Sequence, residues 1–448
     1  MTRGRRRSHD AAAVVCEFQS AQYDAARRVA RALGGVGRPR MARRIFLIAG
    51  ETSGDAIGAK LMLALQREHK GKKLQFSGVG GKRMTDAGLQ TLFPMDDINV
   101  MGFGELIPAL PRLAYRLSQT ISAAREAQPD LVVGIDSKAF CLRVLAALRR
   151  DRRSSSSGPA LVQYVAPSAW AFSDAPKRAA KLANAVDELL VLLPFERDLF
   201  EAAGVPCTFV GHPALQAAED DDDLTAAIDE SCGSLCLLPG SRPDEVSSNL
   251  PVMLDAAERI ASSLQQSPAD GAIDQLLLPA PPSVRSLVEE TIRARPSSSL
   301  PALVTTDRMR HRAYRASRLA LACSGTVNVE LALARTPQVA LYRSNRLTSF
   351  VVRHIVRPTV QHATLPNILN ARDGEASALI PELLFEECTS DAVADEAIRL
   401  LANPEAAKAQ VAASERVLHQ LAVREDDGRV VPSATVAARA LLRRLELS

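Results

Sequence analysis

The stretch Ala322-Cys-Ser-Gly-Thr-Val-Asn-Val-Glu330 decides how this chain is expected to fold. An apolar run that reads as a buried strand ends at Ser324-Gly-Thr326, and a helical pattern opens at Val327. A strand that stops and restarts as a helix turns free backbone N–H groups toward whatever lies above it, which makes an anion site. Glu330, about one helical turn later, could accept hydrogen bonds from a sugar's hydroxyls. An ordinary strand–glycine–helix junction looks the same, so a phosphate role and a purely structural turn both stay open.

Short apolar strands alternate with helical patterns on both sides of this stretch. The predicted strands are 44–49, 74–78, 131–135, 161–165, 188–192 and 208–210, then 235–238, 275–278, 302–305, 319–322 and 338–341. Such alternation is typical of doubly wound parallel sheets. We expect a basic extension (1–42), a first Rossmann-like domain (43–213) and a second Rossmann-like domain with terminal helices (214–448). Ligands would bind at the carboxyl ends of the strands, in a cleft that the two α/β domains face.

Composition excludes several classes of partner. The chain has 448 residues, of which 47% are hydrophobic and 24% charged, as in ordinary globular proteins. Aromatic residues make up only 4%, which argues against a stacking platform for single-stranded nucleic acid. The net charge of +4 comes from the first 44 residues, which hold 11 Arg and three acidic residues. Since the remainder is slightly acidic, we expect no nucleic acid partner.

Cysteine usage indicates neither disulfides nor a metal site. The seven Cys form no C-x-x-C pair, and the His residues do not cluster with them. We therefore expect reduced thiols, no metal and no cofactor. No apolar run approaches the roughly 20 residues of a membrane-spanning helix.

The extension is Arg-rich, acid-poor and amphipathic over residues 11–33, which resembles an organellar transit peptide. The alternatives are a disordered basic tail, or a true start at Met41, directly before the first strand. A transit peptide would send the protein to the mitochondrion. Otherwise we expect a peripheral protein on the cytoplasmic face of an inner membrane.

Gly50-Glu51-Thr52-Ser53-Gly54-Asp55 follows the first predicted strand. Glycines there let a ligand approach the backbone, and Asp55 could cap the helix that follows. The motif is not G-x-G-x-x-G, so a nicotinamide site is weakly supported. Turn chemistry alone would explain these glycines equally well.

Asp136 follows a wholly apolar strand, so its carboxylate should emerge at the mouth of the sheet. A carboxylate in this place can take a proton from a hydroxyl nucleophile. The alternative is a helix N-cap.

Arg242, in Leu238-Pro-Gly-Ser-Arg-Pro243, stands at another strand–turn–helix junction. A guanidinium stays charged and binds in a fork, which suits a diphosphate leaving group. A surface ion pair with a nearby acid is the alternative.

Three further residues are weaker candidates. His212 lies at the expected domain joint, where a lone His is more often structural. Trp170, the only tryptophan, falls in an apolar segment that suits either core or an acceptor pocket. Met101 lies in Val100-Met-Gly-Phe103, and together with Ile107-Pro-Ala-Leu110 this stretch could be a lid, a patch for lipid chains or core.

Taken together, these motifs resemble the lipid-A-disaccharide synthase family over about residues 43–425. The resemblance runs, in order, through Ala49-Gly-Glu-Thr-Ser-Gly-Asp55, Gly78-Val-Gly-Gly81, Val100-Met-Gly-Phe103, Gly134-Ile-Asp136, Tyr164-Val-Ala-Pro-Ser-Ala-Trp170, Leu193-Pro-Phe-Glu196, Phe209-Val-Gly-His212, Leu237-Leu-Pro-Gly-Ser-Arg242, Ser324-Gly-Thr326, Glu330 and Leu365-Pro-Asn-Ile-Leu369. Each motif is modest, but their shared order makes the match specific.

The resemblance implies an inverting, metal-independent glycosyltransferase of the two-domain GT-B fold. Its substrates would be UDP-2,3-diacylglucosamine and 2,3-diacylglucosamine 1-phosphate, which are lipids met at a membrane surface. Asp136 would match the general base. Arg242, Ser324, Gly325, Thr326, Glu330 and Asn367 would match the UDP-sugar site, and Glu51, Ser53, Gly54, Met101, Trp170 and His212 the acceptor side and cleft. A homodimer is left open.

This chain departs from the family where it reads Gly134-Ile-Asp-Ser-Lys-Ala-Phe140 instead of Gly-Ile-Asp-Ala-Pro-Asp-Phe. The second aspartate is lost and Lys138 adds positive charge. That charge would weaken Asp136 as a base, or help to hold the acceptor's phosphate. Trp170-Ala-Phe172 likewise replaces Trp-x-Trp, so acceptor choice is more in question than donor binding.

Two rival functions remain. One is another enzyme of the same fold, a UDP-N-acetylglucosamine 2-epimerase or a lipid-linked sugar transferase. The other is a catalytically silent protein that binds nucleotide sugar or acyl lipid.

Overall fold

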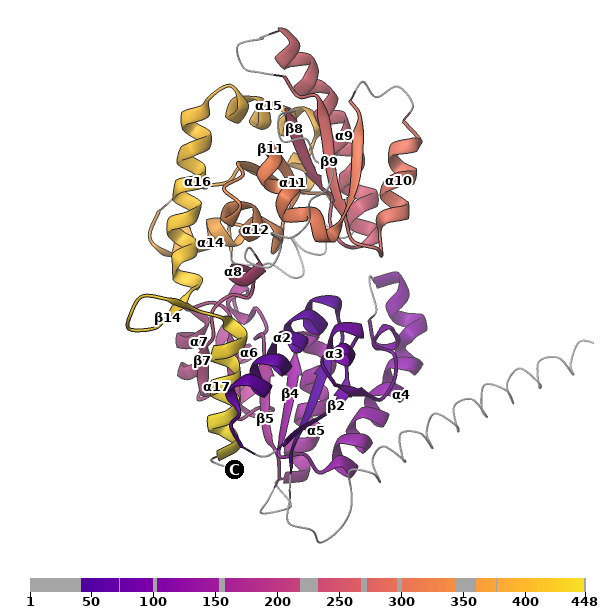
Figure 1. Cartoon of the computed structure of the whole chain (residues 1–448), viewed down its shortest axis with the longest axis vertical. Coiled ribbons are helices and arrows are strands. Elements are labelled where there is room, and N and C mark those ends of the chain that lie inside the picture. The colour runs from indigo at the N-terminus through magenta and orange to yellow at the C-terminus, as the bar shows by residue number, and fades with distance from the viewer. Residues whose placement is uncertain are drawn as a thin grey trace, which may run out of the picture. The chain divides into compact units, whose positions relative to one another are not determined.

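The computed structural model describes residues 42–71, 73–99, 103–152, 158–217, 233–266, 272–295, 300–343, 360–375 and 377–446. They form two compact units, each built on a parallel sheet (Figure 1). Unit 1 takes its described residues from Met1–Ala169, Pro176–Val210 and Ala434–Ser448, and unit 2 from Trp170–Ala175 and Gly211–Ser433.

Unit 1 contains a seven-stranded sheet of order β3-β2-β1-β4-β5-β6-β7. Its strands are β1 (Ala42–Ala49), β2 (Lys73–Val79), β3 (Gln90–Thr91), β4 (Leu131–Ile135), β5 (Ala160–Tyr164), β6 (Glu188–Val191) and β7 (Cys207–Phe209). The helices assigned here are α2 (Thr52–Glu68), α3 (Lys82–Asp86), α4 (Phe103–Ala127), α5 (Lys138–Arg152), α6 (Ala175–Ala183), α7 (Glu196–Ala202) and α17 (Ser433–Glu446).

Both faces of this sheet are buried, which is why its strands read as continuous apolar runs. Ile45 and Leu47 of β1 pack in one core together with α2 and α17. Phe46 and Ile48 point to the opposite face and pack with α4 to α7.

Unit 2 contains a six-stranded parallel sheet of order β10-β9-β8-β11-β12-β13. Its strands are β8 (Ser234–Leu238), β9 (Gln275–Ala280), β10 (Ala302–Thr306), β11 (Ser317–Cys323), β12 (Gln338–Tyr342) and β13 (Glu382–Leu384). The helices are α8 (Ala214–Ala217), α9 (Pro243–Gln266), α10 (Arg285–Arg293), α11 (Arg310–Ala316), α12 (Val327–Leu333), α14 (Leu365–Arg372), α15 (Ser390–Leu401) and α16 (Pro404–Leu418). A short antiparallel pair, β14 (Val423–Arg424) and β15 (Val430–Val431), follows.

The C-terminal helix departs from the expected division of the chain. We placed it in the second domain with the other terminal helices, but α17 belongs to unit 1. Its Ala437, Ala438 and Leu441 are fully buried in the core that also holds β1, β4 and β5. The small alanine side chains let the helix lie close to the sheet.

Every predicted strand is present, with ends that differ by one or two residues. The strands that the sequence did not predict are short: β3, β13, β14 and β15 have two or three residues each. From Phe103 onward, the stretch expected to be a broken lid, patch or core segment is the start of α4, which carries Pro108 and Pro111 within it. Met101 lies outside the described residues. None of the described helices is long and apolar enough to cross a membrane.

Candidate active site

Two motifs of unit 1 meet where β1 and β4 end. Because these strands are parallel neighbours, their carboxyl ends share one edge of the sheet. Ser53 at the start of α2 donates its hydroxyl to Oδ2 of Asp136, with 2.7 Å between the oxygens. Gly54 makes this approach possible: a Cβ there would lie 3.1 Å from the carbonyl oxygen of Ile135 and 3.5 Å from Cβ of Asp136. The structure therefore brings together three residues that the sequence predicted separately.

The backbone after β4 is held in an unusual conformation. Asp136 has a φ of 52° and Ser137 a φ of 29°, values that side chains other than glycine rarely adopt. The first amides of α5, those of Phe140 and Cys141, bond to the carbonyl of Ser137. The Asp136 carboxylate accepts its hydrogen bond from α2 and not from α5. The N-cap alternative for Asp136 is therefore wrong.

Glu51 lies on the same side of the sheet as Asp136. It precedes α2 and is half-buried. Burial raises the pKa of the Cys141 thiol to about 12, and the charges of Asp136 and Glu51 add to that rise. The thiol therefore stays protonated and unreactive.

Asp55 has a different partner from the one expected. Its buried carboxylate accepts the amides of Gly81 (2.8 Å), Arg83 (3.0 Å) and Met84 (3.0 Å). It thus caps α3 rather than its own helix α2. These hydrogen bonds connect the segment 50–55 to the segment 78–84, so the role of Asp55 is structural.

In unit 2, Ser324, Gly325 and Thr326 connect β11 to α12. Two of the three amides expected to be free are occupied: Ser324 N–H donates to the carbonyl of Leu341 (3.1 Å), and Gly325 N–H to Oδ1 of Asn328 (2.8 Å). Within the described part of the chain, the Thr326 amide has no partner. Gly325 and Thr326 are exposed, and a Cβ on Gly325 would meet nothing within 4 Å. This loop therefore offers one amide and two hydroxyls to a ligand.

A network of buried side-chain amides stabilises the Ser324–Thr326 loop. Nδ2 of Asn328 donates to Oε1 of Gln338 (2.9 Å), and Gln338 returns a bond to the Asn328 carbonyl (3.0 Å). Gln410 of α16 exchanges two further hydrogen bonds with the Gln338 backbone. The position of the loop is thus set by hydrogen bonds among α12, β12 and α16, and the contact from α16 spans 72 positions of the sequence.

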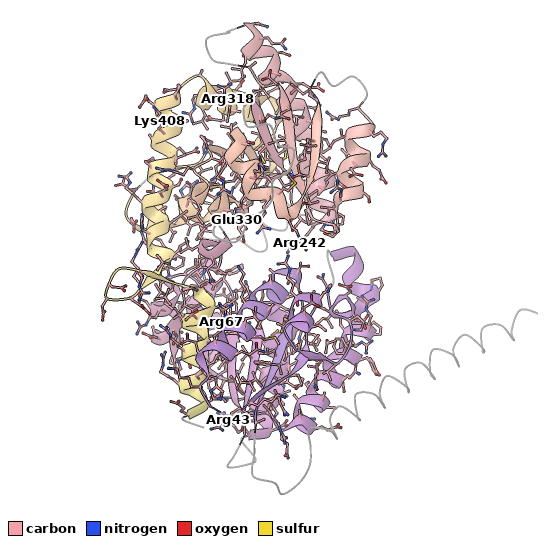
Figure 2. All side chains as sticks on the ribbon, viewed as in Figure 1. Arg43, Arg67, Arg242, Arg318, Glu330 and Lys408 are labelled. Atoms are coloured by element: carbon pink, nitrogen blue, oxygen red, sulfur yellow. The ribbon has the colours of Figure 1, made fainter. Side chains whose placement is uncertain are left out.

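Glu330 is held by two side chains of α11. Oε2 of Glu330 accepts from the Tyr314 hydroxyl at 3.3 Å and lies 3.2 Å from Nε of Arg310. The Glu330 side chain keeps 14% of its surface exposed. Figure 2 shows Glu330 toward the same end of unit 2 as Arg242.

Arg242 stands in the turn between β8 and α9. Its Nη1 pairs with Oε1 of Glu245 at 3.1 Å, and Glu245 also accepts the amides of Ser241 and Arg242. Gly240, with a φ of 121°, makes room for Glu245, whose Oε2 would lie 2.5 Å from a Cβ at that position. The expected alternative of an ion pair is thus present. The paired Arg242 side chain still keeps 54% of its surface exposed, so it can meet a ligand.

Asn367 has no hydrogen-bonding capacity left for a ligand. Its Nδ2 donates to the Ile380 carbonyl and to Oε1 of Glu382, both at 2.8 Å. Its Oδ1 accepts the amides of Leu379 (2.8 Å) and Ile380 (2.9 Å). Since an amide side chain makes four such bonds at most, Asn367 shapes the loop before β13.

His212 and Trp170 both belong to unit 2. Nδ1 of His212 accepts the amide of Ala214 at the start of α8, and burial lowers the His212 pKa to about 4. The imidazole is therefore neutral and structural. Trp170 is half-buried, and the guanidinium of Arg372 lies 5.8 Å from its ring centre.

Asn249 is a functional support that the sequence analysis missed. This fully buried residue of α9 donates to the Pro239 carbonyl (2.9 Å) and accepts the Arg343 amide (2.8 Å). It therefore joins the carboxyl ends of β8 and β12 beside Arg242. The available signal was an amide on the apolar face of a helix, next to Leu250.

The described residues contain no group of three or more His, Cys, Asp or Glu side chains placed to hold a metal ion.

Comparison with known proteins identifies the family. The family model described as lipid-A-disaccharide synthetase matches residues 45–431. The chain belongs to the lipid-A-disaccharide synthase family. The lipid-A-disaccharide synthase of Rhodospirillum centenum is 41% identical over 402 residues, which covers 89% of this chain and 94% of that one. A relative from Arabidopsis thaliana, named "Probable lipid-A-disaccharide synthase, mitochondrial", is 33% identical and covers 84% of this chain and 83% of its own.

Solved structures show that this synthase family member has the GT-B architecture predicted from its sequence. The UDP-GlcNAc 2-epimerase of Neisseria meningitidis, solved with UDP-GlcNAc, aligns with a TM-score of 0.54 at 9% identity and covers 91% of this chain and all of that one. A calicheamicin glycosyltransferase aligns with a TM-score of 0.52 at 13% identity, covering 91% and 99%. At these identities the likeness concerns the fold alone.

Proposed function

We propose that the protein joins UDP-2,3-diacylglucosamine to 2,3-diacylglucosamine 1-phosphate, giving lipid A disaccharide 1-phosphate and UDP. Membership of the lipid-A-disaccharide synthase family supports the reaction class. The observation that carries the chemistry is the 2.7 Å hydrogen bond from Ser53 to Asp136. It holds a carboxylate at the mouth of a sheet, where a general base can reach a hydroxyl nucleophile.

Asp136 acts as the general base in this proposal. Ser53 engages Oδ2, and among the described residues no second donor reaches the carboxylate. Oδ1 takes the proton of the acceptor's hydroxyl as that oxygen bonds to the donor's anomeric carbon. The bond from this carbon to UDP breaks in the same step, so a single displacement inverts the configuration.

Arg242 and the Thr326 amide receive the negative charge that develops on the departing UDP. The Arg242 guanidinium is fixed by Glu245 and still half exposed, which suits fork binding of a diphosphate. Preorganised donors of this kind stabilise charge without reorganising during the reaction. Glu330, oriented by Tyr314 and Arg310, accepts the ribose hydroxyls. In this proposal these groups neutralise the leaving group, and no metal ion takes part in the displacement.

The test is a reconstitution with the full chain. The protein is incubated with UDP-2,3-diacylglucosamine, with and without 2,3-diacylglucosamine 1-phosphate, and the products are analysed by mass spectrometry. The proposal requires disaccharide phosphate only when both lipids are present. Release of UDP without the acceptor would instead support a 2-epimerase, and saturable UDP binding without turnover a silent binding protein.

The setting of the reaction follows from its substrates. Both are lipids with charged head groups, so we propose that the protein docks peripherally on a membrane surface. The name of the Arabidopsis relative includes the word mitochondrial, which supports the proposal that the basic extension of residues 1–42 is a mitochondrial targeting sequence. Residues 1–41 lie outside the described part of the chain, and Ala42 is the first residue of β1. Sequencing the N-terminus of the mature protein tests this proposal, since a start at Met1 would contradict it.

A further inference from the structure

Gln163 is a polar residue in the middle of a buried strand. It lies in β5, between Val162 and Tyr164, and is fully buried. A buried amide is costly unless it finds partners. Its Nε2 lies within hydrogen-bond distance of three backbone carbonyls, those of Asp136 (3.1 Å), Tyr164 (3.1 Å) and Val165 (3.3 Å). Because Nε2 carries two hydrogens, one of them is shared between two of these carbonyls.

The carbonyls of Asp136 and Val165 lie in the loops that follow β4 and β5, and that of Tyr164 ends β5 itself. Asp136 (φ 52°), Ser137 (φ 29°) and Val165 (φ 69°) are three of the six described non-glycine residues with positive φ. Such conformations persist only where the surrounding structure fixes them, and they cluster at functional sites. The amide of Gln163 bonds both loops at once. A direct backbone bond, from the Asp136 amide to the Tyr164 carbonyl (3.0 Å), completes the connection.

Gly134 shows how closely the fold is built around this side chain. A glycine inside a strand weakens it. A Cβ at Gly134, however, would lie 2.5 Å from Oε1 of Gln163. That oxygen is buried and has no hydrogen-bond partner in the described part of the chain. An apolar side chain of the same size would avoid this unsatisfied oxygen, so what the glutamine contributes is its Nε2 group.

We propose that Gln163 is a positioning residue that sets the location of the Asp136 carboxylate. This inference rests on the proposed function, in which Asp136 is the base. Gln163 fixes the peptide after Asp136 and therefore the direction of its Cα–Cβ bond. Ser53 fixes the far end of the same side chain. The base is thus held at two points, one from a neighbouring strand and one from a neighbouring helix.

The test compares Gln163→Met with Gln119→Met in the disaccharide assay. Methionine keeps the length of glutamine and removes its donors. Gln119 is a matched control, since it is also a buried amide of unit 1, is bonded to Arg116 on α4 and lies outside the site. We expect Gln163→Met to lower kcat roughly 10- to 100-fold with KM for both lipids within two-fold, because small misplacement of a reacting group costs rate rather than binding. Gln119→Met should leave kcat within two-fold.

A double-mutant cycle with Gly134 separates positioning from general damage to the fold. Gly134→Ala alone should push the Gln163 side chain aside and reproduce the loss in kcat. In a Gln163→Ala background the contact with Oε1 is gone and the contact with Cβ of Cys141 (2.8 Å) remains, so the same substitution should lower kcat by a smaller factor than it does in the wild type. Thermal melting and UDP affinity, recorded for every variant, report the folded fraction, and kcat is normalised to it.

Equal normalised kcat for Gln163→Met and Gln119→Met would overturn the inference, as would a loss confined to KM or additive effects in the cycle. If Gln163→Met fails to fold, the cycle with Gln163→Ala decides. These outcomes differ from failure of the proposed function, which would appear as a wild-type chain that forms no disaccharide or an Asp136→Asn variant that keeps its turnover.

Discussion

The hydroxyl of Ser53 and the carboxylate of Asp136 are separated by 83 positions in the sequence and share a hydrogen bond of 2.7 Å. The bond joins the first turn of one helix to the strand end that precedes another. Among the described residues the carboxylate accepts no hydrogen bond from the amides of α5, so it does not cap that helix. The hydrogen bond orients the carboxylate through Oδ2 and leaves Oδ1 able to accept a proton.

Asp136→Asn should abolish most of the turnover while leaving UDP binding intact. The asparagine side chain cannot take the proton from the hydroxyl of the acceptor sugar, and loss of a general base lowers the rate by about 10²- to 10⁴-fold. Ser53→Ala should lower the turnover less, roughly ten-fold, because the base remains but loses one of the hydrogen bonds that position it. Single-turnover kinetics and UDP titration of each variant provide the measurement. Wild-type turnover in Asp136→Asn would remove this residue from the chemistry.

Arg242→Ala should weaken UDP binding by about 10- to 100-fold, the loss expected for a charge-assisted contact to a diphosphate. Arg259→Ala is the matched control, since Arg259 lies on the same helix α9 and pairs with an exposed acid, Asp391. That variant should bind UDP as the wild type does. Isothermal titration with UDP decides, and equal affinities for the two variants would contradict the role of Arg242.

Asn367→Ala should destabilise the fold before it affects binding. It leaves the amides of Leu379 and Ile380 without their acceptor and takes a donor from Glu382. We expect a loss of roughly 2–4 kcal/mol in the free energy of unfolding of unit 2, because unsatisfied buried groups are expensive. Asn403→Ala, which removes the exposed cap of α16, should cost only about 1 kcal/mol. Denaturant unfolding compares the two, and an unchanged midpoint for Asn367→Ala would refute the structural role.

His212 should make stability depend on pH in mild acid. Burial lowers its pKa in the folded chain from 6.5 to about 4. Between pH 6.5 and about 4, His212 therefore binds a proton in the unfolded chain but not in the folded chain. Stability is full above pH 6.5 and is lost as the pH falls toward 4, by at most roughly 3 kcal/mol.

His212→Asn, which keeps an acceptor for the Ala214 amide, should remove this part of the pH dependence. The measurement is the difference between the wild-type and variant melting temperatures from pH 7.5 to 4. Parallel curves over that range would show that His212 does not carry the effect.

The sheets could be predicted from the sequence because both their faces are buried, and a strand buried on both sides is a plain apolar run. The same logic predicted Asp136, since a polar residue directly after such a run must emerge at the sheet's edge. Strands of two or three residues, such as β3 and β13, are too short to carry a pattern.

The supports of the site could not be predicted in this way. Asn249 meets Arg343 across 94 positions, and Gln410 meets Gln338 across 72. No local period encodes such pairs. The occupied amide of Ser324 was missed for the same reason, because its acceptor is the Leu341 carbonyl on a neighbouring strand. The Gly325 amide, in contrast, has a local acceptor, Oδ1 of Asn328 three residues later. Local pattern predicted which residues lie at the strand ends, and the tertiary contacts determine which of their polar groups are already hydrogen-bonded within the protein.

The return of α17 to unit 1 has a consequence for how the protein is made. The core around β1 stays incomplete until the last helix has left the ribosome, although β1 is among the first segments synthesised. Both segments of unit 2, Trp170–Ala175 and Gly211–Ser433, precede the last segment of unit 1 in the chain, so unit 2 can finish folding first, against the usual order of synthesis. A truncation of α17 or a bulky tag after it should therefore destabilise unit 1, although most of that unit is N-terminal, and leave unit 2 folded.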